Sequence, residues 1–188
     1  MGRWPGGAQE RLQSAAIELF SERGYERTTV AEIAKNAGLT ERTFYNHFAD
    51  KRDVLFPAQD RFIAEVVEAV GAAPADRSPL DAVAAALTVD TEWFDQRRDA
   101  AQRRKRILDT RAELRERELA KMAALDTAIS AALRARGGSA TSAAVTAAAA
   151  VAAYRLGTDN WLADSRRRTL RHHLRSTFGE LRRTAEDW

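Results

Sequence analysis

One short segment of the chain carries hydroxyl, imidazole and cationic side chains in a pattern that suits the binding of phosphate and of nucleotide bases. These side chains are Thr28, Thr29, Thr40, Arg42, Thr43, Tyr45, His47 and Lys51. Hydroxyl, imidazole and ammonium groups donate hydrogen bonds to phosphate oxygens, and the planar fork of an arginine matches two acceptors on a guanine edge. The chemistry that this set predicts is the reversible binding of double-stranded DNA.

The spacing of residues around this set predicts two short helices joined by a tight turn within residues 29–51. Thr29 and Glu32 have the spacing of a capping box, in which each side chain hydrogen-bonds the backbone amide of the other residue. Gly38 is expected to end the first helix, because glycine adopts a left-handed backbone without a Cβ penalty. Thr40 is the expected N-cap of the second helix. This arrangement is typical of a helix-turn-helix, which places its second helix in the DNA major groove.

The second helix is expected to turn one polar face outward. Phe44 and Phe48 lie four residues apart and therefore point inward together. Thr40, Arg42 and Thr43 fall in the first turn, the part of a recognition helix that lies nearest the base edges. Arg42 is the expected base contact, because arginine pairs bidentately with guanine. The alternative for Arg42 is an ordinary solvated side chain.

The other polar side chains of the set are expected to bind phosphate. Thr28 and Thr29 lie at a helix N-terminus, where backbone amides favour an anion, and a capping role for Thr29 is compatible with DNA contact. Tyr45 and His47 suit phosphate oxygens, although His47 has an alternative position packed beneath the domain. Lys51 is expected to clamp a phosphate at the start of the next helix.

The segment before the helix-turn-helix completes a small helical domain. Leu12, Ala16, Leu19 and Phe20 form an apolar stripe at helical spacing. We therefore predict an N-terminal three-helix domain over residues 8–50. A domain of roughly 40 residues is small for an independent core, so it should pack against other parts of the chain.

The run from Glu18 to Leu55, ELFSERGYERTTVAEIAKNAGLTERTFYNHFADKRDVL, resembles the DNA-binding domain of the TetR family of transcriptional regulators. The resemblance implies an all-α homodimer with a C-terminal helical domain, over residues 51–188, that binds an effector and dimerises. We expect a repressor that a small molecule releases from its DNA, with stronger DNA binding in the presence of the ligand as the open alternative. The operator is expected to be palindromic or nearly so, because a two-fold dimer meets two half-sites. The resemblance also implies that Tyr45 contacts phosphate. Weaker similarity over residues 53–161 resembles a subgroup with acyl-CoA-like effectors.

Composition agrees with a regulator and gives an enzyme little support. The chain has no cysteine, so disulfides and thiol chemistry are excluded and a reducing cytoplasm is the expected location. The sequence shows neither a glycine-rich phosphate loop nor metal-ligand spacing. The adjacent residues His172 and His173 point about 100° apart on a helix and do not easily share a metal. We expect no catalytic site, no cofactor and no membrane partner.

The charge of the predicted DNA-binding segment does not follow the usual pattern. Residues 1–56 hold eight arginine and lysine residues and eight aspartate and glutamate residues. The basic surface usually sought in a DNA-binding protein is therefore missing. The alternative function is a helical protein-interaction module that has kept the helix-turn-helix shape without binding DNA. Salt-dependent binding to promoter DNA would separate the two.

The rest of the chain is predicted to be helical. A long amphipathic helix is expected over residues 51–71, with a kink or break at Pro57 because proline has no amide hydrogen and clashes with a preceding carbonyl. We hypothesise that an effector shifts this helix and so resets the spacing of the two recognition helices. The Ser78–Pro79 pair marks a helix start. Thr110 and Glu113 again have capping-box spacing.

Aromatic, methionine and aliphatic residues of the middle helices are the candidates for an effector cavity. They are Phe62, Val66, Trp93, Phe94, Ile107, Leu108, Met122, Leu125, Tyr154 and Trp161. The alternative for each is a place in the ordinary core. A basic cluster over residues 97–106 suits the phosphates of a CoA ester, but nearby acidic residues favour a salt-bridged, solvated surface.

The last two predicted helices indicate a dimer. Residues 139–163 are crowded with alanine, which permits close helix approach. Leu170, Leu174, Phe178 and Leu181 form a stripe in the following helix. Two such helices from each subunit would close a four-helix bundle. In the alternative, both helices bury these residues against their own chain.

Overall fold

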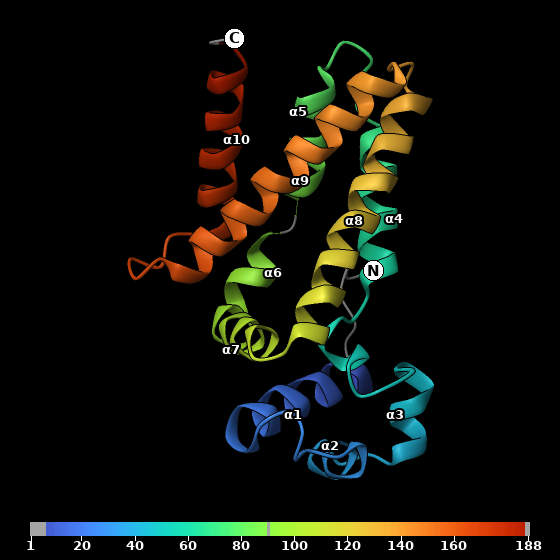
Figure 1. Cartoon of the computed structure of the whole chain (residues 1–188), viewed down its shortest axis with the longest axis vertical. Coiled ribbons are helices and arrows are strands. Elements are labelled where there is room, and N and C mark those ends of the chain that lie inside the picture. Colours follow the sequence, from blue (N-terminus) through green and yellow to red (C-terminus); the bar gives the residue numbers. More distant parts are fainter. Residues whose placement is uncertain (1–6, 90, 187–188) are drawn as a thin grey trace. The chain divides into compact units, whose positions relative to one another are not determined.

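The computed structural model describes residues 7–89 and 91–186, which form α-helices and one short 3-10 helix, η1, joined by turns and loops (Figure 1). Along the chain the elements are α1 (Ala8–Arg23), α2 (Val30–Asn36), α3 (Glu41–His47), η1 (Asp53–Leu55), α4 (Gln59–Gly71), α5 (Pro79–Leu87), α6 (Thr91–Gln96), α7 (Arg98–Asp109), α8 (Ala112–Ala135), α9 (Ala140–Ala163) and α10 (Leu170–Glu186). No strand occurs within the described ranges, and the predicted all-α fold class is confirmed. Among these same helices, none has both the length and the apolar character needed to cross a membrane.

The chain divides into two compact units. The N-terminal unit contains the residues up to Gln59 together with Asp99–Glu118. The C-terminal unit contains Asp60–Arg98 and the residues from Leu119 onward. Each unit is therefore built from two separate stretches of sequence, and α7 and α8 contribute residues to both.

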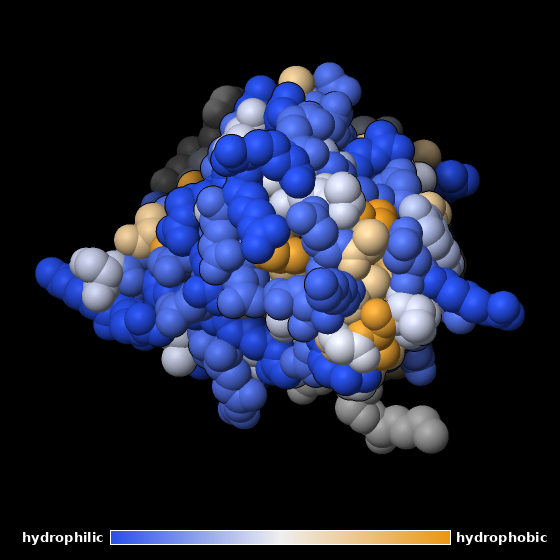
Figure 2. Space-filling model, turned by 90° about the horizontal axis from the view of Figure 1, so that it is seen from below, coloured by the Kyte–Doolittle hydropathy of each residue, from blue (hydrophilic) through white to orange (hydrophobic). Residues whose placement is uncertain are grey.

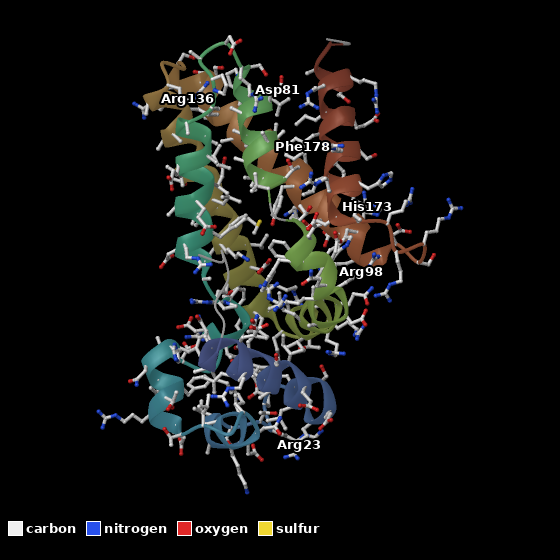
Figure 3. All side chains as sticks on the ribbon, turned by 180° about the vertical axis from the view of Figure 1, so that it is seen from behind. Arg23, Asp81, Arg98, Arg136, His173 and Phe178 are labelled. Carbon is white, nitrogen blue, oxygen red and sulfur yellow. The ribbon has the colours of Figure 1, made fainter. Side chains whose placement is uncertain are left out.

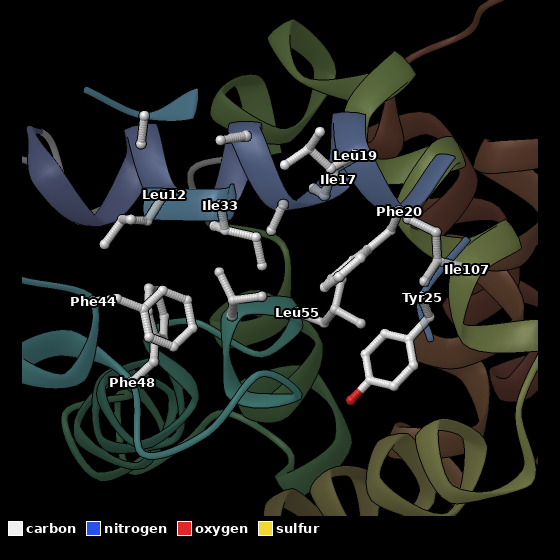
Figure 4. Packing of buried hydrophobic residues seen from close by; sticks show 14 of the residues in the cluster. Leu12, Ile17, Leu19, Phe20, Tyr25, Ile33, Phe44, Phe48, Leu55 and Ile107 are labelled. Carbon is white, nitrogen blue, oxygen red and sulfur yellow. The ribbon is translucent and has the colours of Figure 1, made fainter. Parts of the chain in front are cut away.

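The core of the N-terminal unit explains this division. Apolar side chains of α1, α2 and α3 meet in one buried cluster (Figure 4). Ile107 and Leu108 of α7 and Leu114 of α8 are buried in the same cluster. The expectation that the small three-helix domain needs apolar surface from elsewhere in the chain is therefore confirmed. The boundary predicted at residue 50 assigns these three residues to the other domain.

The helix-turn-helix has the local structure that its sequence predicts. The Thr29 hydroxyl accepts from the Glu32 amide at 3.2 Å, and the Glu32 carboxylate accepts from the Thr29 amide at 2.8 Å, which completes the capping box. The hydrogen bond from the Thr29 amide lowers the pKa of Glu32. Gly38, just after α2, has a left-handed φ of 66°. The Thr40 hydroxyl accepts from the Thr43 amide at 3.2 Å and caps α3.

The helix predicted over residues 51–71 is interrupted at Pro57, the position at which a kink or a break was predicted. The 3-10 helix ends at Leu55, and α4 begins at Gln59. Proline at this position has no amide hydrogen with which to continue a helical ladder. The next residue, Ala58, has a φ of 55°, a left-handed conformation that is unfavourable for a residue with a side chain. Pro57 therefore breaks the helix rather than kinking it.

The capping box predicted for Thr110 and Glu113 is wrong. The Thr110 hydroxyl donates to the carbonyl of Ile107 at 2.7 Å and closes the last turn of α7, before α8 begins. The spacing of the two residues is that of a box, but one of them belongs to the preceding helix end. The helix start predicted at Ser78 is confirmed, because its hydroxyl accepts from the Asp81 amide at 3.1 Å.

In the C-terminal unit α10 packs along α9. A glycine permits the close approach: a Cβ at Gly157 would lie 2.8 Å from side-chain atoms of Leu174 and Thr177. Leu170, Leu174 and Phe178 are all buried within the single chain. The prediction that these three residues face a second subunit is therefore corrected, and for α10 the alternative of burial against the same chain holds.

The opposite situation is found on α9, where an apolar stripe is left uncovered. Val145, Ala148, Ala152 and Leu156 recur at helical spacing and are all exposed. The exposed fraction is 64% for Val145 and 55% for Leu156. Isolated apolar residues at a surface are normal, whereas a continuous stripe marks a surface that another element can cover.

Candidate DNA interface

Two buried rings hold α3 in place and leave its other face in solvent. Phe44 and Phe48 are buried with their ring centroids 5.3 Å apart. Arg42, Tyr45 and His47 are exposed. On the side of the molecule drawn in Figure 2, the surface is largely hydrophilic and is interrupted by small apolar patches. The helix is therefore fixed by its aromatic face while its polar side chains remain available.

The first turn of α3 combines one unengaged arginine with two hydroxyls that bind each other. The Oγ1 atoms of Thr40 and Thr43 lie 2.9 Å apart. Arg42 is exposed, and its guanidinium has no hydrogen-bond or ion-pair partner among the residues that the structure describes. All five of its N–H donors are therefore available for base edges or phosphate.

Tyr45 and His47 also point into solvent. The exposed fraction of Tyr45 is 56%, and its ring lies edge-on to Phe44 with centroids 5.6 Å apart. His47 is exposed, so the alternative position beneath the domain does not hold. Both side chains are exposed and carry polar atoms that can bind phosphate oxygens.

Thr28 is not available for DNA, contrary to the prediction. Its side chain is buried, and its hydroxyl donates to the carbonyl of Gly24 at 3.0 Å in the loop between α1 and α2. Thr29 is exposed, but its hydroxyl is engaged with Glu32 in the capping box. Of this pair, only Thr29 remains a candidate for phosphate contact.

Lys51 has an internal role, and its assignment as a phosphate clamp is corrected. Its Nζ donates to the carbonyl of Tyr25 at 2.9 Å and to the carbonyl of Thr28 at 3.0 Å. The ammonium group thus joins the turn after α3 to the loop before α2, and only one of its three donors remains. These partners lie 26 and 23 residues away along the chain, so no local sequence pattern could have indicated them.

The ring beside Lys51 is a neutral phenol. Burial of Tyr25, followed by the negative charges of Glu113 and Asp50, raises its pKa to about 12. The Lys51 Nζ lies 4.3 Å from the centroid of this ring. A desolvated cation over an aromatic face gains electrostatic stabilisation from the ring quadrupole. The contact reinforces the two hydrogen bonds to the carbonyls.

The basic cluster on α7 is partly neutralised inside the N-terminal unit. Arg104 pairs with Glu118 at 2.7 Å and donates to the carbonyl of Leu55 at 2.5 Å. Lys105 pairs with Asp109 at 2.9 Å. For these two cations the salt-bridged alternative is therefore favoured over a grip on CoA phosphates. The two stretches of the unit together hold fifteen basic and thirteen acidic residues, so its formal charge is only +2.

The ten predicted effector-binding residues do not form one group. Ile107 and Leu108 are buried in the core of the N-terminal unit, so their place in an effector cavity is corrected. They combine helical spacing with apolar side chains, which is equally the signature of core. The other eight lie in the C-terminal unit: Phe62, Val66, Trp93, Phe94, Met122, Leu125, Tyr154 and Trp161.

Several of these eight residues are packed as core. Val66, Leu125 and Trp161 are buried, and the rings of Phe62 and Tyr154 lie 6.1 Å apart. Two hollows of this unit lie elsewhere: a groove of about 760 Å³ between α5 and α10, near Asp81 and Phe178 (Figure 3), and one of about 590 Å³ at the turn from α8 to α9. Neither is lined by any of the eight.

Residues 12–57 match the model of a family described as bacterial regulatory proteins, tetR family. The regulator TcmR of Streptomyces glaucescens is 36% identical over 79 residues, which cover 42% of this chain and 35% of TcmR. The fatty acid metabolism regulator protein of Bacillus subtilis is 35% identical over 58 residues, 31% of this chain and 30% of that protein. The chain thus matches about a third of the length of these curated relatives.

Solved structures extend the similarity to most of the chain. Thermus thermophilus FadR, a TetR family transcriptional repressor in complex with lauroyl-CoA, is 28% identical with a TM-score of 0.57, and 92% of each chain is covered. The SmeT–triclosan complex, SmeT being a repressor from Stenotrophomonas maltophilia, has 18% identity and a TM-score of 0.62, with 92% of this chain and 90% of SmeT covered. At that identity the second comparison concerns the fold alone.

Removal of the Lys51 ammonium should loosen the helix-turn-helix. We predict that Lys51→Met lowers the free energy of unfolding by about 2 kcal/mol, because two partly buried carbonyls lose a charged donor. Urea unfolding followed by circular dichroism measures the change. The matched control is Lys35→Met, at an exposed lysine of α2, which should leave stability nearly unchanged. Equal stabilities of the two variants would contradict the internal role of Lys51.

Proposed function

We propose that this chain belongs to the TetR family of transcriptional regulators and is a ligand-responsive repressor that binds a palindromic operator as a homodimer. The observation that carries the proposal is α3, a short helix fixed by Phe44 and Phe48 whose exposed face presents Arg42, Tyr45 and His47. The family match of residues 12–57 supports it. A two-fold dimer meets two half-sites, which is why the operator is expected to be palindromic.

The exposed residues have separable proposed roles. Arg42 contacts a guanine edge from the first turn of α3, with Thr40 and Thr43 beside it. Tyr45 and His47 donate to phosphate oxygens. Thr29, at the start of α2, adds a further contact to a phosphate of the DNA. Phosphate contacts position a protein on DNA, whereas base contacts specify the sequence. Substitutions at the two kinds of residue should therefore have different effects.

A protein-interaction module that does not bind DNA is the second candidate function. The observation that favours it is the N-terminal unit's formal charge of only +2. Such a module would show no salt-dependent binding to promoter DNA. A repressor loses DNA affinity as salt rises, because its phosphate contacts release condensed counterions.

The exposed stripe of α9 is the proposed dimer contact. Val145 and Leu156 are its large apolar members, and Ala148 and Ala152 between them are small enough for close helix approach. A two-fold axis would place the stripe against its own copy. This contact replaces the stripe of α10 that the sequence suggested.

The effector is proposed to be a hydrophobic small molecule of the acyl-CoA type that releases the DNA. The similarity to FadR in complex with lauroyl-CoA supports this class. The eight predicted residues of the C-terminal unit are the proposed contacts, and their packed core must open to admit the acyl chain. Helix α4 carries Phe62 and Val66 and begins just after the break at Pro57, which makes it the proposed moving element.

Substitution of Arg42 tests the recognition role of α3. We predict that Arg42→Ala removes about 1–3 kcal/mol of discrimination at one base pair of each half-site. Tyr45→Phe is the matched comparison and should weaken binding to all sequences alike. Fluorescence anisotropy with the upstream region and with single-base variants of it measures both effects. If Arg42→Ala left affinity and base preference unchanged, the assignment of Arg42 would be overturned.

Charge introduced into the stripe of α9 tests the dimer. The double variant Val145→Asp/Leu156→Asp should raise the dimer dissociation constant at least about a hundred-fold, because burial of unpaired carboxylates is costly. Sedimentation velocity gives the oligomeric state. Leu119→Asp is the control, at a leucine of α8 that is 55% exposed and outside the stripe. A double variant that remains dimeric would show that the stripe of α9 is not the dimer contact.

Addition of lauroyl-CoA tests the effector class. We predict a fall in DNA affinity of about 5–150-fold, the usual range of coupling between two sites. Val66→Trp should abolish this response by filling the core around α4, while Leu119→Trp on the exposed face of α8 should retain it. Anisotropy titrations with and without lauroyl-CoA measure the DNA affinity of the wild type and of both variants. A DNA affinity indifferent to the ligand would discard the acyl-CoA class and leave the DNA-binding function standing.

A further inference from the structure

Positive charge is concentrated at the turn from α9 to α10. Residues 165–175, here called the arginine corner, contain five arginines and no acidic residue. The 56 residues that include the helix-turn-helix have no net charge. The strongest local excess of positive charge in this comparison thus lies outside the expected DNA-binding segment.

The arginine corner is anchored by a buried guanidinium. Arg98, of which only 4% is exposed, donates to the carbonyls of Trp161, Asp164 and Arg168. These carbonyls lie at the end of α9 and in the turn, where a helix leaves acceptors without intrahelical partners. Asp95 adds a second anchor, since its Oδ1 accepts from the Leu170 amide at 2.8 Å at the start of α10.

Asp164 fixes the inner side of the same turn. Its carboxylate accepts from the amides of Arg166 at 2.9 Å and Arg168 at 3.1 Å, and from Nε of Arg168 at 2.9 Å. Its Oδ2 also lies 3.0 Å from Nε2 of the buried His173. The hydrogen bond from the Arg168 side chain is the largest of the effects that hold the pKa of Asp164 well below its usual range. The carboxylate therefore stays ionised and bonded at neutral pH.

These anchors keep one arginine in an unfavourable backbone conformation. Arg167 has a φ of 54°, in the left-handed region that residues with side chains rarely adopt. It lies between the two residues whose amides Asp164 holds. Such conformations persist where the surroundings impose them, and they occur most often at functional positions. These hydrogen bonds thus hold the backbone of the corner in one conformation, although its side chains are exposed.

Three arginines of the corner point into solvent. Arg166, Arg171 and Arg175 are exposed. No hydrogen-bond or ion-pair partner of their side chains occurs within residues 7–89 and 91–186. Arg171 and Arg175 lie four residues apart on α10 and therefore on one face of the helix. The corner therefore carries three guanidinium groups whose charge no acidic side chain of the described residues neutralises.

We propose that the arginine corner is a second DNA-binding surface, which contacts backbone phosphates without reading bases. The inference rests on the proposed DNA-binding function. Duplex DNA carries one negative charge per about 1.7 Å of its axis and gains affinity from each phosphate that a cation neutralises. Guanidinium matches phosphate oxygens in a bidentate geometry. The exposed guanidinium groups of the corner would add this electrostatic contribution to the contacts that α3 makes.

The salt dependence of DNA binding tests the proposal. The full chain is titrated onto a labelled duplex from its upstream region and onto an unrelated duplex, at KCl concentrations from about 50 to 200 mM. For Arg171→Gln/Arg175→Gln, the slope of log K against log[KCl] should become shallower by about 2–4 per homodimer, since four arginines are lost and each lost phosphate contact contributes about 0.9. The loss should be equal on both duplexes, because the corner reads no bases.

Two further variants separate charge from shape and position. Arg171→Lys/Arg175→Lys keeps both charges and should retain most of the slope. Arg77→Gln/Arg134→Gln removes the same charge at exposed arginines of the C-terminal unit outside the corner, and it should behave as the wild type. Sedimentation velocity and thermal melting confirm that each variant keeps its oligomeric state and fold.

The outcomes distinguish this proposal from the function on which it rests. A wild-type chain that binds neither duplex would overturn the repressor itself. If the wild type binds and Arg171→Gln/Arg175→Gln has the same slope of log K against log[KCl], the arginine corner is not a DNA-binding surface, and the repressor function stands. An acidic protein would then be the partner that the charge of the corner fits. An equal loss of slope in the Arg77→Gln/Arg134→Gln control would also overturn it, because the effect would then come from total charge.

Discussion

The burial of Phe44 and Phe48 is the constraint on which the DNA-facing surface depends. Both rings lie in the N-terminal core, and the four-residue spacing between them orients every other side chain of α3. Helices α7 and α8 complete this core by adding Ile107, Leu108 and Leu114 to it. The polar face of the helix is therefore set by apolar contacts from distant parts of the chain.

Most features with local causes could be predicted from the sequence, apart from the capping box at Thr110 and Glu113, whereas features with distant partners could not. The capping box of Thr29 and Glu32 depends on residues three apart, and spacing alone identified it. Lys51 carries the residue type expected of a phosphate clamp, yet two carbonyls more than twenty residues away hold it inside the domain. Thr28 is likewise a polar residue at the right position whose burial no pattern indicated.

Formal charge is a poor measure of the field that this protein presents to DNA. In the N-terminal unit, Glu32 is engaged in a helix cap, and Asp53 is paired with Arg117. These carboxylates serve the fold, while Arg42 is left outward and unengaged. A neutral count over residues 1–56 is therefore compatible with a surface of placed donors. The same distinction separates the paired cations of α7 from the exposed arginines beyond α9.

The central claim is that a fixed α3 reads DNA sequence, and selection of binding sites from a random-sequence duplex library by the full-length chain tests it most directly. The account predicts enrichment of a palindromic or nearly palindromic site, because two copies of α3 related by a two-fold axis meet two half-sites. Selection with the Arg42→Ala variant should give a site that no longer shows a base preference at one position of each half-site. A library without enrichment after repeated rounds would contradict the account and favour the protein-interaction module.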